Sequence, residues 1–223
     1  MKQGNCCYSS VLKLITFLIL PVLFSGCQSV YYDAMEKVGI HKRDILVDRV
    51  EEAKDAQSEA KEQFASALAQ YQSVVTIENQ ALVDKYELLN DEYEDSKTSA
   101  AAVSDRIDAV EEVSEALFDE WEDELSLYSN AKLRQQSAQK LSATKRKYKT
   151  LIKAMRRSEQ KMAPVLAAFQ DQVLFLKHNL NAQAINALKG ELKSIQGDVA
   201  RLVKEMENSI KESESFIKSL SEG

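Results

Sequence analysis

The residues of this chain that could do metal or nucleotide chemistry are few and poorly placed. The two histidines, His41 and His178, stand far apart, and no H-E-x-x-H spacing occurs, so a metal site is not predicted. The chain also lacks the G-x-x-x-x-G-K-[ST] loop that holds a nucleotide phosphate. We therefore expect no metal, no nucleotide and no other cofactor.

Carboxylates are concentrated between Asp105 and Glu124, where ten acids accompany one base. Acid–base catalysis needs a carboxyl group in a pocket that shifts its pKa. A long helix instead presents such acids on its outer faces, so a solvated surface is favoured over a catalytic pair. Trp121 falls on the apolar face and is interpreted as core. We expect no enzyme activity and no small-molecule substrate.

The three cysteines lie near the N-terminal end, and Cys27 alone has the context of a processing site. Lys2 and Lys13 supply a basic start, an apolar run follows at 14–24, and Ser25 and Gly26 precede Cys27. This order is typical of a secretory signal peptide. The run is shorter than the ~20 residues of a transmembrane helix.

The Ser-Gly-Cys sequence resembles the lipobox of bacterial lipoproteins. The resemblance implies cleavage before Cys27 and acylation of its thiol and its new amine, which together anchor a protein stably. Gln28 stands where Asp would retain a lipoprotein in the inner membrane, so the resemblance implies an outer-membrane protein that faces the periplasm. An ordinary secretory signal is the alternative. Since Cys6 and Cys7 would be removed, thiol chemistry and disulfides are not expected.

A basic segment follows the acidic one, with eleven bases and one acid between Lys132 and Lys161. Seven of these bases form a candidate partner surface: Lys145, Arg146, Lys147, Lys149, Lys153, Arg156 and Arg157. Clustered bases with an aromatic residue can bind nucleic acid, but export and a net charge of −6 argue against it. Two interpretations stay open: pairing with the acidic segment, or binding of an anionic envelope component.

The elements that must position these residues are helices. Six glycines and two prolines in 223 residues leave few tight turns, which argues against sandwiches, barrels and doubly wound sheets. We predict an all-α fold, an elongated antiparallel bundle of three to four long helices with coiled-coil heptads. Three regions are expected: a removed signal peptide at 1–26, a lipidated tether at 27–43 and the bundle domain at 44–220.

Apolar periodicity places these helices along the chain. A seam from Leu82 to Trp121 has alternating steps of four and three residues, which is typical of a heptad helix. The first helix should run from Asp44 to about Tyr71, with Leu68 in its apolar face, and break or kink at the β-branched residues 74–77. The last helix follows a similar seam from Leu188 to Met206.

Breaks between the later helices are predicted from their polar residues. Asn130 should cap the third helix, in which Leu133 is an apolar position, and Pro164 should kink that helix or begin a new one. Asn179 and Asn181 offer another break. The apolar segment 165–180 is expected to be the best-buried part of the mature chain.

Charge favours a hairpin over one continuous helix. Residues 28–124 carry a net charge of −17, residues 125–223 carry +9, and the sign reverses near Asn130. A turn there would lay the acidic helix antiparallel against the basic one, whereas a straight helix would leave both charge runs unpaired. Exposed ion pairs add only ~0–1 kcal/mol each, so they select the pairing more than they stabilise it.

Three segments carry a family resemblance: LNDEYEDS at 89–96, EALFDEWEDEL at 115–125 and FLKHNLNAQAI at 175–185. With the lipoprotein signal, they resemble the uncharacterised proteobacterial family known as domain of unknown function twenty-nine fifty-nine. The resemblance covers the mature chain and implies a helical lipoprotein, with no catalytic residues to carry over.

These observations predict a bacterial envelope lipoprotein with a non-catalytic structural or protein-interaction role in the periplasm. Its partners would be the membrane, through the lipid anchor, and a protein or a second copy that meets the helical seams. The alternative is a binding module for peptidoglycan, lipopolysaccharide or phospholipid through the basic helix 132–161. Salt separates the two, because only electrostatic capture weakens steeply with ionic strength.

Overall fold

The computed structural model describes residues 35, 39–76, 81–179 and 181–221. Contacts divide the chain into two units, residues 1–44 and residues 45–223. The long helices are α3 (Lys42–Thr76), α4 (Leu82–Glu124), α5 (Ala131–His178) and α6 (Ala182–Ser221), and a 3-10 turn, η2 (Leu125–Leu127), follows α4. The described residues contain no strand, so the all-α prediction is confirmed.

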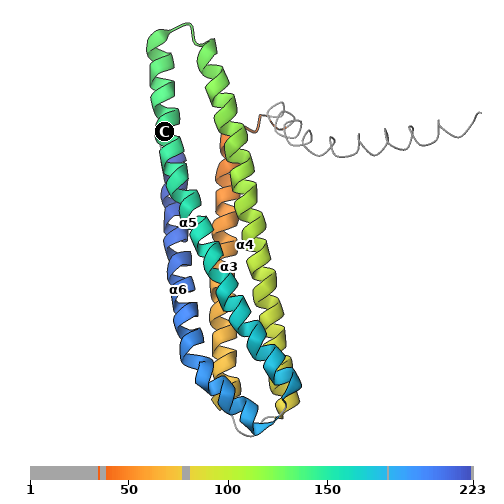
Figure 1. Cartoon of the computed structure of the whole chain (residues 1–223). Coiled ribbons are helices and arrows are strands. Elements are labelled where there is room, and N and C mark those ends of the chain that lie inside the picture. Colours follow the sequence, from red (N-terminus) through yellow and green to blue (C-terminus); the bar gives the residue numbers. More distant parts are fainter. Residues whose placement is uncertain (1–34, 36–38, 77–80, 180, 222–223) are drawn as a thin grey trace, which may run out of the picture. The chain divides into compact units, whose positions relative to one another are not determined.

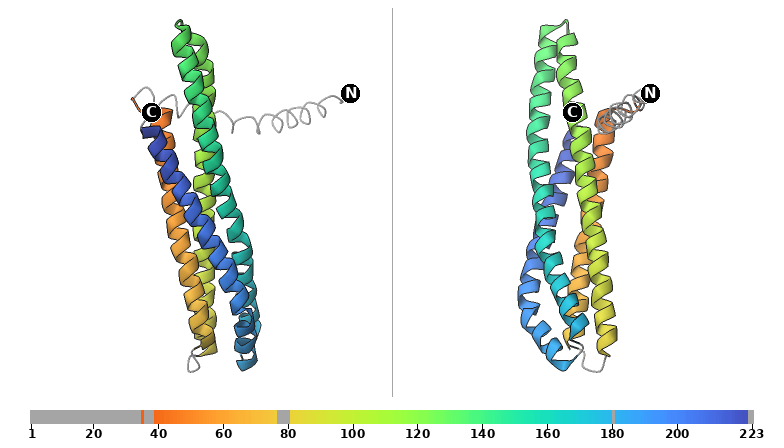
Figure 2. Two further views of the ribbon diagram at one scale, coloured as in Figure 1. Left: turned by 90° about the vertical axis from the view of Figure 1, so that its left-hand side faces the viewer. Right: turned by 45° about the vertical axis from the view of Figure 1, so that its right-hand side comes forward.

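Within residues 45–223, successive helices run antiparallel (Figures 1 and 2). Contacts between neighbouring helices give this direction, because residue numbers rise on one helix as they fall on the next. The joined pairs are Glu52–Arg106 and Gln63–Glu92 for α3 and α4, Ser104–Glu159 and Glu122–Lys145 for α4 and α5, and Tyr148–Phe216 and Arg157–Glu205 for α5 and α6. The predicted antiparallel bundle is therefore confirmed.

Heptad spacing organises the core of the bundle. The predicted seam of α4 is confirmed, since none of its twelve residues from Leu82 to Trp121 is exposed. In α3 the buried positions alternate in steps of four and three: Leu46, Val50, Ala53, Gln57, Ala60, Phe64, Ala67, Tyr71 and Val74. Such a spacing keeps one stripe of each helix against its neighbours. Phe64 stacks on Phe169 of α5, with ring centroids 6.5 Å apart.

Two details of α3 differ from the sequence prediction. The β-branched stretch does not break the helix before Thr76, because Val74 and Val75 are buried and their packing outweighs a modest loss of helix propensity. Leu68 is only half-buried, and Ala67 takes the core position. The predicted break at residue 77 itself lies outside the described residues.

The course of α5 also corrects the sequence prediction. The helix continues through Pro164, so a new helix at this residue is wrong. Pro164 lies on the exposed face while Met162 and Val165 are buried, and packing on both sides offsets the missing backbone hydrogen bond.

The apolar segment 165–180 is less buried than predicted. Leu174 and Phe175 are exposed even though Val173 and Leu176 beside them are buried. A helix buries one stripe, so an unbroken apolar run leaves some side chains on its outer face. The side chain of Leu180 lies outside the described residues.

Two asparagines begin the last two helices. The cap at Asn130 was predicted, whereas Asn181 was predicted only as part of a break. Asn130 Oδ1 accepts hydrogen bonds from the backbone N–H groups of Lys132 (2.9 Å) and Leu133 (3.2 Å). Asn181 Oδ1 accepts from those of Gln183 (3.0 Å) and Ala184 (3.1 Å). Each side chain satisfies donors that the first turn of a helix leaves unpaired. The predicted turn near Asn130 is confirmed.

The α4–α5 hairpin extends beyond the ends of α3 and α6 (Figures 1 and 2). Phe216, five residues before the end of α6, lies beside Tyr148 of α5, at 6.4 Å between ring centroids. Beyond that level the buried residues of α4 end at Phe118, and those of α5 comprise only Leu141. We call residues 119–147 the hairpin extension. α3 and α6 end near the base of this stretch, so α4 and α5 have fewer neighbouring helices over most of it.

Candidate functional site

The seven predicted surface bases all lie on α5, but the structure gives them different surroundings. Arg156 has the densest set of partners. Its guanidinium donates to Asp108 and Glu111 of α4 and to Glu159 of α5. The hydrogen bonds to Glu111 raise the pKa of Arg156 above its usual value, against the opposing effect of burial, and those to Asp108 and Glu159 add to the rise. Arg156 therefore joins α5 to α4.

Two more of the seven bases pair within the bundle. Lys145 Nζ lies 2.6 Å from Glu122 Oε1 of α4 and 5.4 Å from the ring centroid of Phe118. Arg157 lies 3.9 Å from Glu205 of α6, a longer and exposed pair. These contacts agree with the interpretation of internal charge pairing for three of the seven positions.

The other four bases are exposed and have no acidic partner among the described residues. Arg146 donates to Ser142 Oγ of its own helix at 2.8 Å. The side chains of Lys147, Lys149 and Lys153 make no hydrogen bond or ion pair with another described residue. The predicted surface is thus two sets: a paired set that holds helices together and an unpaired set that faces solvent.

A groove lies between α4 and α5 along the hairpin extension, with a volume of about 450 Å³. It is lined by Glu122 of α4 and Leu125 of η2, and by Ala138, Leu141, Ser142, Lys145, Arg146 and Lys149 from α5. The α5 residues form two rows with a spacing of four, 138, 142 and 146 and 141, 145 and 149, which places them on one face of that helix. We call this feature the α4–α5 groove. Sequence analysis found its bases but did not predict the groove.

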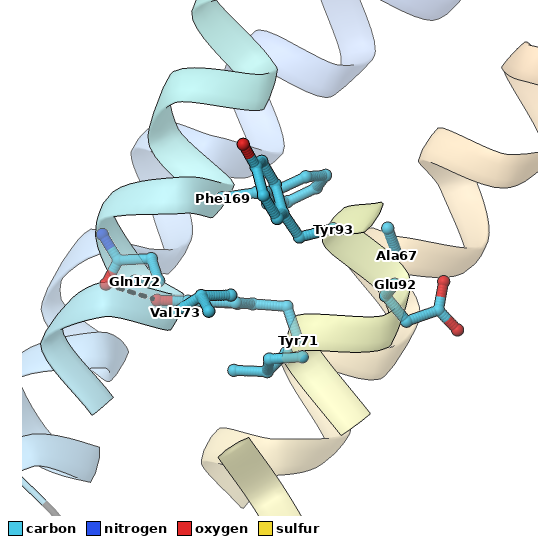
Figure 3. Close-up of a pocket in the computed structure, with 8 residues that line it drawn as sticks. Ala67, Tyr71, Glu92, Tyr93, Phe169, Gln172 and Val173 are labelled. Carbon is cyan, nitrogen blue, oxygen red and sulfur yellow. Dashed lines mark hydrogen bonds between the residues drawn. The ribbon is translucent and has the colours of Figure 1, made fainter. Parts of the chain in front are cut away.

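A second, much smaller crevice lies between α3, α4 and α5 around Tyr71 (Figure 3). The Tyr71 hydroxyl donates to the Leu188 carbonyl oxygen of α6 at 2.7 Å and lies 3.3 Å from Gln172 Oε1. Burial, and then the charge of Glu191, raise the pKa of Tyr71. The Glu92 carboxylate points away from this hydroxyl (Figure 3). With about 10 Å³, the crevice has room for about one water molecule.

Buried polar side chains form a third set, which sequence analysis missed. Gln57 donates its amide N–H to Ser158 Oγ at 2.9 Å, and Lys85 Nζ donates to the Val74 carbonyl oxygen at 2.7 Å. The first contact joins α3 to α5, and the second joins the end of α3 to the start of α4. For Gln57 the position in the heptad was the available signal, since the steps of four and three in α3 pass through it. The seam of α4 steps from Leu82 to Tyr86 and gave no such signal for Lys85.

The remaining candidates are spread over the surface. His41 and His178 are exposed, and no group of three His, Cys, Asp or Glu side chains able to hold a metal ion occurs in the part of the chain that the structure describes. Trp121 is half-buried and donates its Nε1–H to Ser137 Oγ at 2.8 Å.

The predicted lipidation site Cys27 and sorting residue Gln28 lie outside the described residues. Within residues 39–76, 81–179 and 181–221, no helix combines the length and the apolar character needed to cross a membrane.

Comparison with known proteins gives one match. Residues 31–220 match the model of a family described as "Protein of unknown function (DUF2959)". No curated protein and no solved structure is significantly similar to the chain.

Proposed function

This chain belongs to the DUF2959 family, so its function has to be inferred from its own residues, and we propose that it is a lipid-anchored envelope protein. Its role is non-catalytic, either structural or in protein interaction, and it lies in the outer membrane facing the periplasm. The signal-like segment that ends at Cys27 supports the anchor. A bundle of 35- to 48-residue helices supports a structural role, because the longest spans about 70 Å.

The observation that carries the interaction role is the end of the hairpin extension. Leu127, Tyr128 and Leu133 are 80%, 39% and 50% exposed there. Large apolar side chains gathered at an exposed end are typical of a protein-contact surface. The heptad seams are already buried inside the bundle, so the extension supports contact with a partner better than the seams do.

The anchor is tested at Cys27. Cys27→Ala should leave an uncut precursor that incorporates no labelled fatty acid, because acylation of the thiol comes before cleavage of the signal peptide. Cys7→Ala is the matched control, since it removes a thiol from the segment that would be discarded, and it should be processed as wild type. Normal processing of Cys27→Ala would reject the lipid anchor.

Sorting is tested at Gln28. The wild type should fractionate with outer-membrane markers, and Gln28→Asp should move it to the inner membrane. Recovery of the wild type wholly with inner-membrane markers would reject outer-membrane delivery while leaving the anchor intact.

A second candidate function is a binding module for an anionic envelope component. It is favoured by the four exposed bases of α5 that lack acidic partners, Arg146, Lys147, Lys149 and Lys153. Binding of this kind should weaken steeply from low to moderate salt, whereas apolar contact with a protein should not. Salt-independent binding would reject the second candidate.

A further inference from the structure

The α4–α5 groove holds more positive charge than its acid balances. Lys145, Arg146 and Lys149 line it with a single carboxylate, Glu122. Glu122 is engaged by Lys145 at 2.6 Å. Like charges three or four residues apart on a helix oppose each other, so an anion between Arg146 and Lys149 would relieve their repulsion.

The donors of the groove suit a phosphate group. Arg146 is held at the groove wall by its 2.8 Å hydrogen bond to Ser142 Oγ, and Ser142 also lines the groove. A guanidinium has five N–H donors in a rigid fork, so one bond to Ser142 leaves others for a ligand. Guanidinium and ammonium groups together make strong, charge-assisted hydrogen bonds to phosphate oxygen atoms.

The groove also has an apolar part. Leu125, Ala138 and Leu141 line it beside the bases, and Leu141 is almost fully buried. Its volume of about 450 Å³ lies in the range of small-molecule sites, ~300–1,000 Å³. The same volume accommodates only about one turn of a partner helix, whose diameter is ~10 Å. A phosphate joined to a short length of hydrocarbon matches the groove better than a helix does.

We propose that the α4–α5 groove binds the phosphate group of an anionic membrane lipid. Arg146 and Lys149 contact the phosphate, and Leu125 and Leu141 contact the adjoining hydrocarbon. The inference rests on the second candidate function, which supplies the negative charge of the ligand. It does not depend on the lipid anchor at Cys27.

Calorimetry with the full chain in a non-ionic detergent tests the site, with dihexanoyl phosphatidic acid as the probe. The double variant Arg146→Gln/Lys149→Gln should bind the probe at least tenfold more weakly, because two charge-assisted hydrogen bonds are lost. Lys147→Gln/Lys153→Gln removes the same charge from exposed positions of the same helix outside the groove, and it should stay within twofold of wild type. Circular dichroism checks that both variants remain helical.

Two further probes separate the sources of the ligand. Inorganic phosphate should bind at least tenfold more weakly than the lipid phosphate, because it leaves the apolar part unfilled, and dihexanoyl phosphatidylcholine should bind more weakly than phosphatidic acid. Equal binding of inorganic phosphate would overturn the lipid assignment. An acidic helical peptide that binds at Arg146 and Lys149 where the lipid phosphate does not would assign the groove to a protein.

The outcomes also separate this proposal from the functions above. Equal weakening by the two double variants would show that anions bind the whole basic helix, which removes the groove site and keeps the second candidate. Failure of every anion to bind removes both. Fatty-acid labelling at Cys27 does not depend on the binding experiments, so it tests the lipid anchor separately.

Discussion

The two ends of α5 show the same kind of sequence in different surroundings. Where α3 and α6 cover it, Leu151 is fully buried and Arg156 has acidic partners on α4 and on its own helix. In the hairpin extension, Leu133 is half exposed, and the hydrogen-bond partner of Arg146 is Ser142 of its own helix. Neighbouring helices decide how deeply the leucines of α5 are buried. For the bases the face of α5 also matters, because Lys145 pairs with Glu122 inside the extension while Lys153 is exposed in the covered part.

The largest expected difference between these regions concerns leucine truncation. Leu151→Ala should lower the free energy of unfolding by about 2–5 kcal/mol, because it leaves a cavity in the covered core. Leu133→Ala makes the same change in the same helix and should cost at most about 0.5 kcal/mol. Urea denaturation followed by circular dichroism measures both. Equal losses would show that the extension is as tightly packed as the core.

The next difference concerns the bases of α5. Arg156→Gln should cost about 1–2 kcal/mol, the effect of breaking charged hydrogen bonds reduced for their partial exposure to solvent. Lys153→Gln, an exposed neighbour, should change stability by less than about 0.5 kcal/mol. Urea denaturation measures the stability loss of each variant, and high salt should reduce the difference between the two losses because it screens the ion pairs of Arg156. A variant of Lys153 that destabilises as much as that of Arg156 would contradict the division into paired and unpaired bases.

High pH should destabilise the covered region through its buried tyrosine, Tyr71. Tyr71 has a raised pKa in the folded state, so it keeps its proton where the unfolded chain loses it. The contribution of protonated Tyr71 to the free energy of unfolding is therefore complete below pH ~10 and falls above it. At about pH 11 the loss should be about 1.4 kcal/mol.

Tyr71→Phe removes this dependence, so wild type and variant should converge in stability between pH 9 and pH 11. Parallel curves for wild type and Tyr71→Phe would show that the Tyr71 proton is not linked to folding.

The smallest effect concerns the two asparagine caps. Asn181→Ala should lower the global free energy of unfolding by about 1 kcal/mol, because α6 is packed into the bundle. Asn130→Ala should instead act locally, with faster hydrogen exchange at the amides after the turn and little change around Leu151. A global loss from Asn130→Ala as large as that from Asn181→Ala would mean that the extension unfolds together with the rest.

The helices and their breaks were predicted from the sequence because their signals are local. The seam from Leu82 to Trp121 needs only alternating apolar steps, and Asn130 and Asn181 need only a side-chain oxygen one turn from free backbone N–H groups. Gln57 was missed for the same reason, since a polar residue in a heptad position carries no apolar signal. Val74 and Val75 were misjudged because burial outweighed their weak helix propensity.

The sequence by itself determined an all-helical chain with an acidic half, a basic half and a turn between them. It could not determine which bases pair. Lys149, Lys153 and Arg156 belong to one basic run and differ only in the direction in which each side chain points from α5. Tertiary structure decided this by placing Asp108 and Glu111 of α4 beside Arg156 and Glu205 of α6 near Arg157. The physical reason is that ion pairing and burial depend on distances between helices, and no local pattern along one helix specifies them.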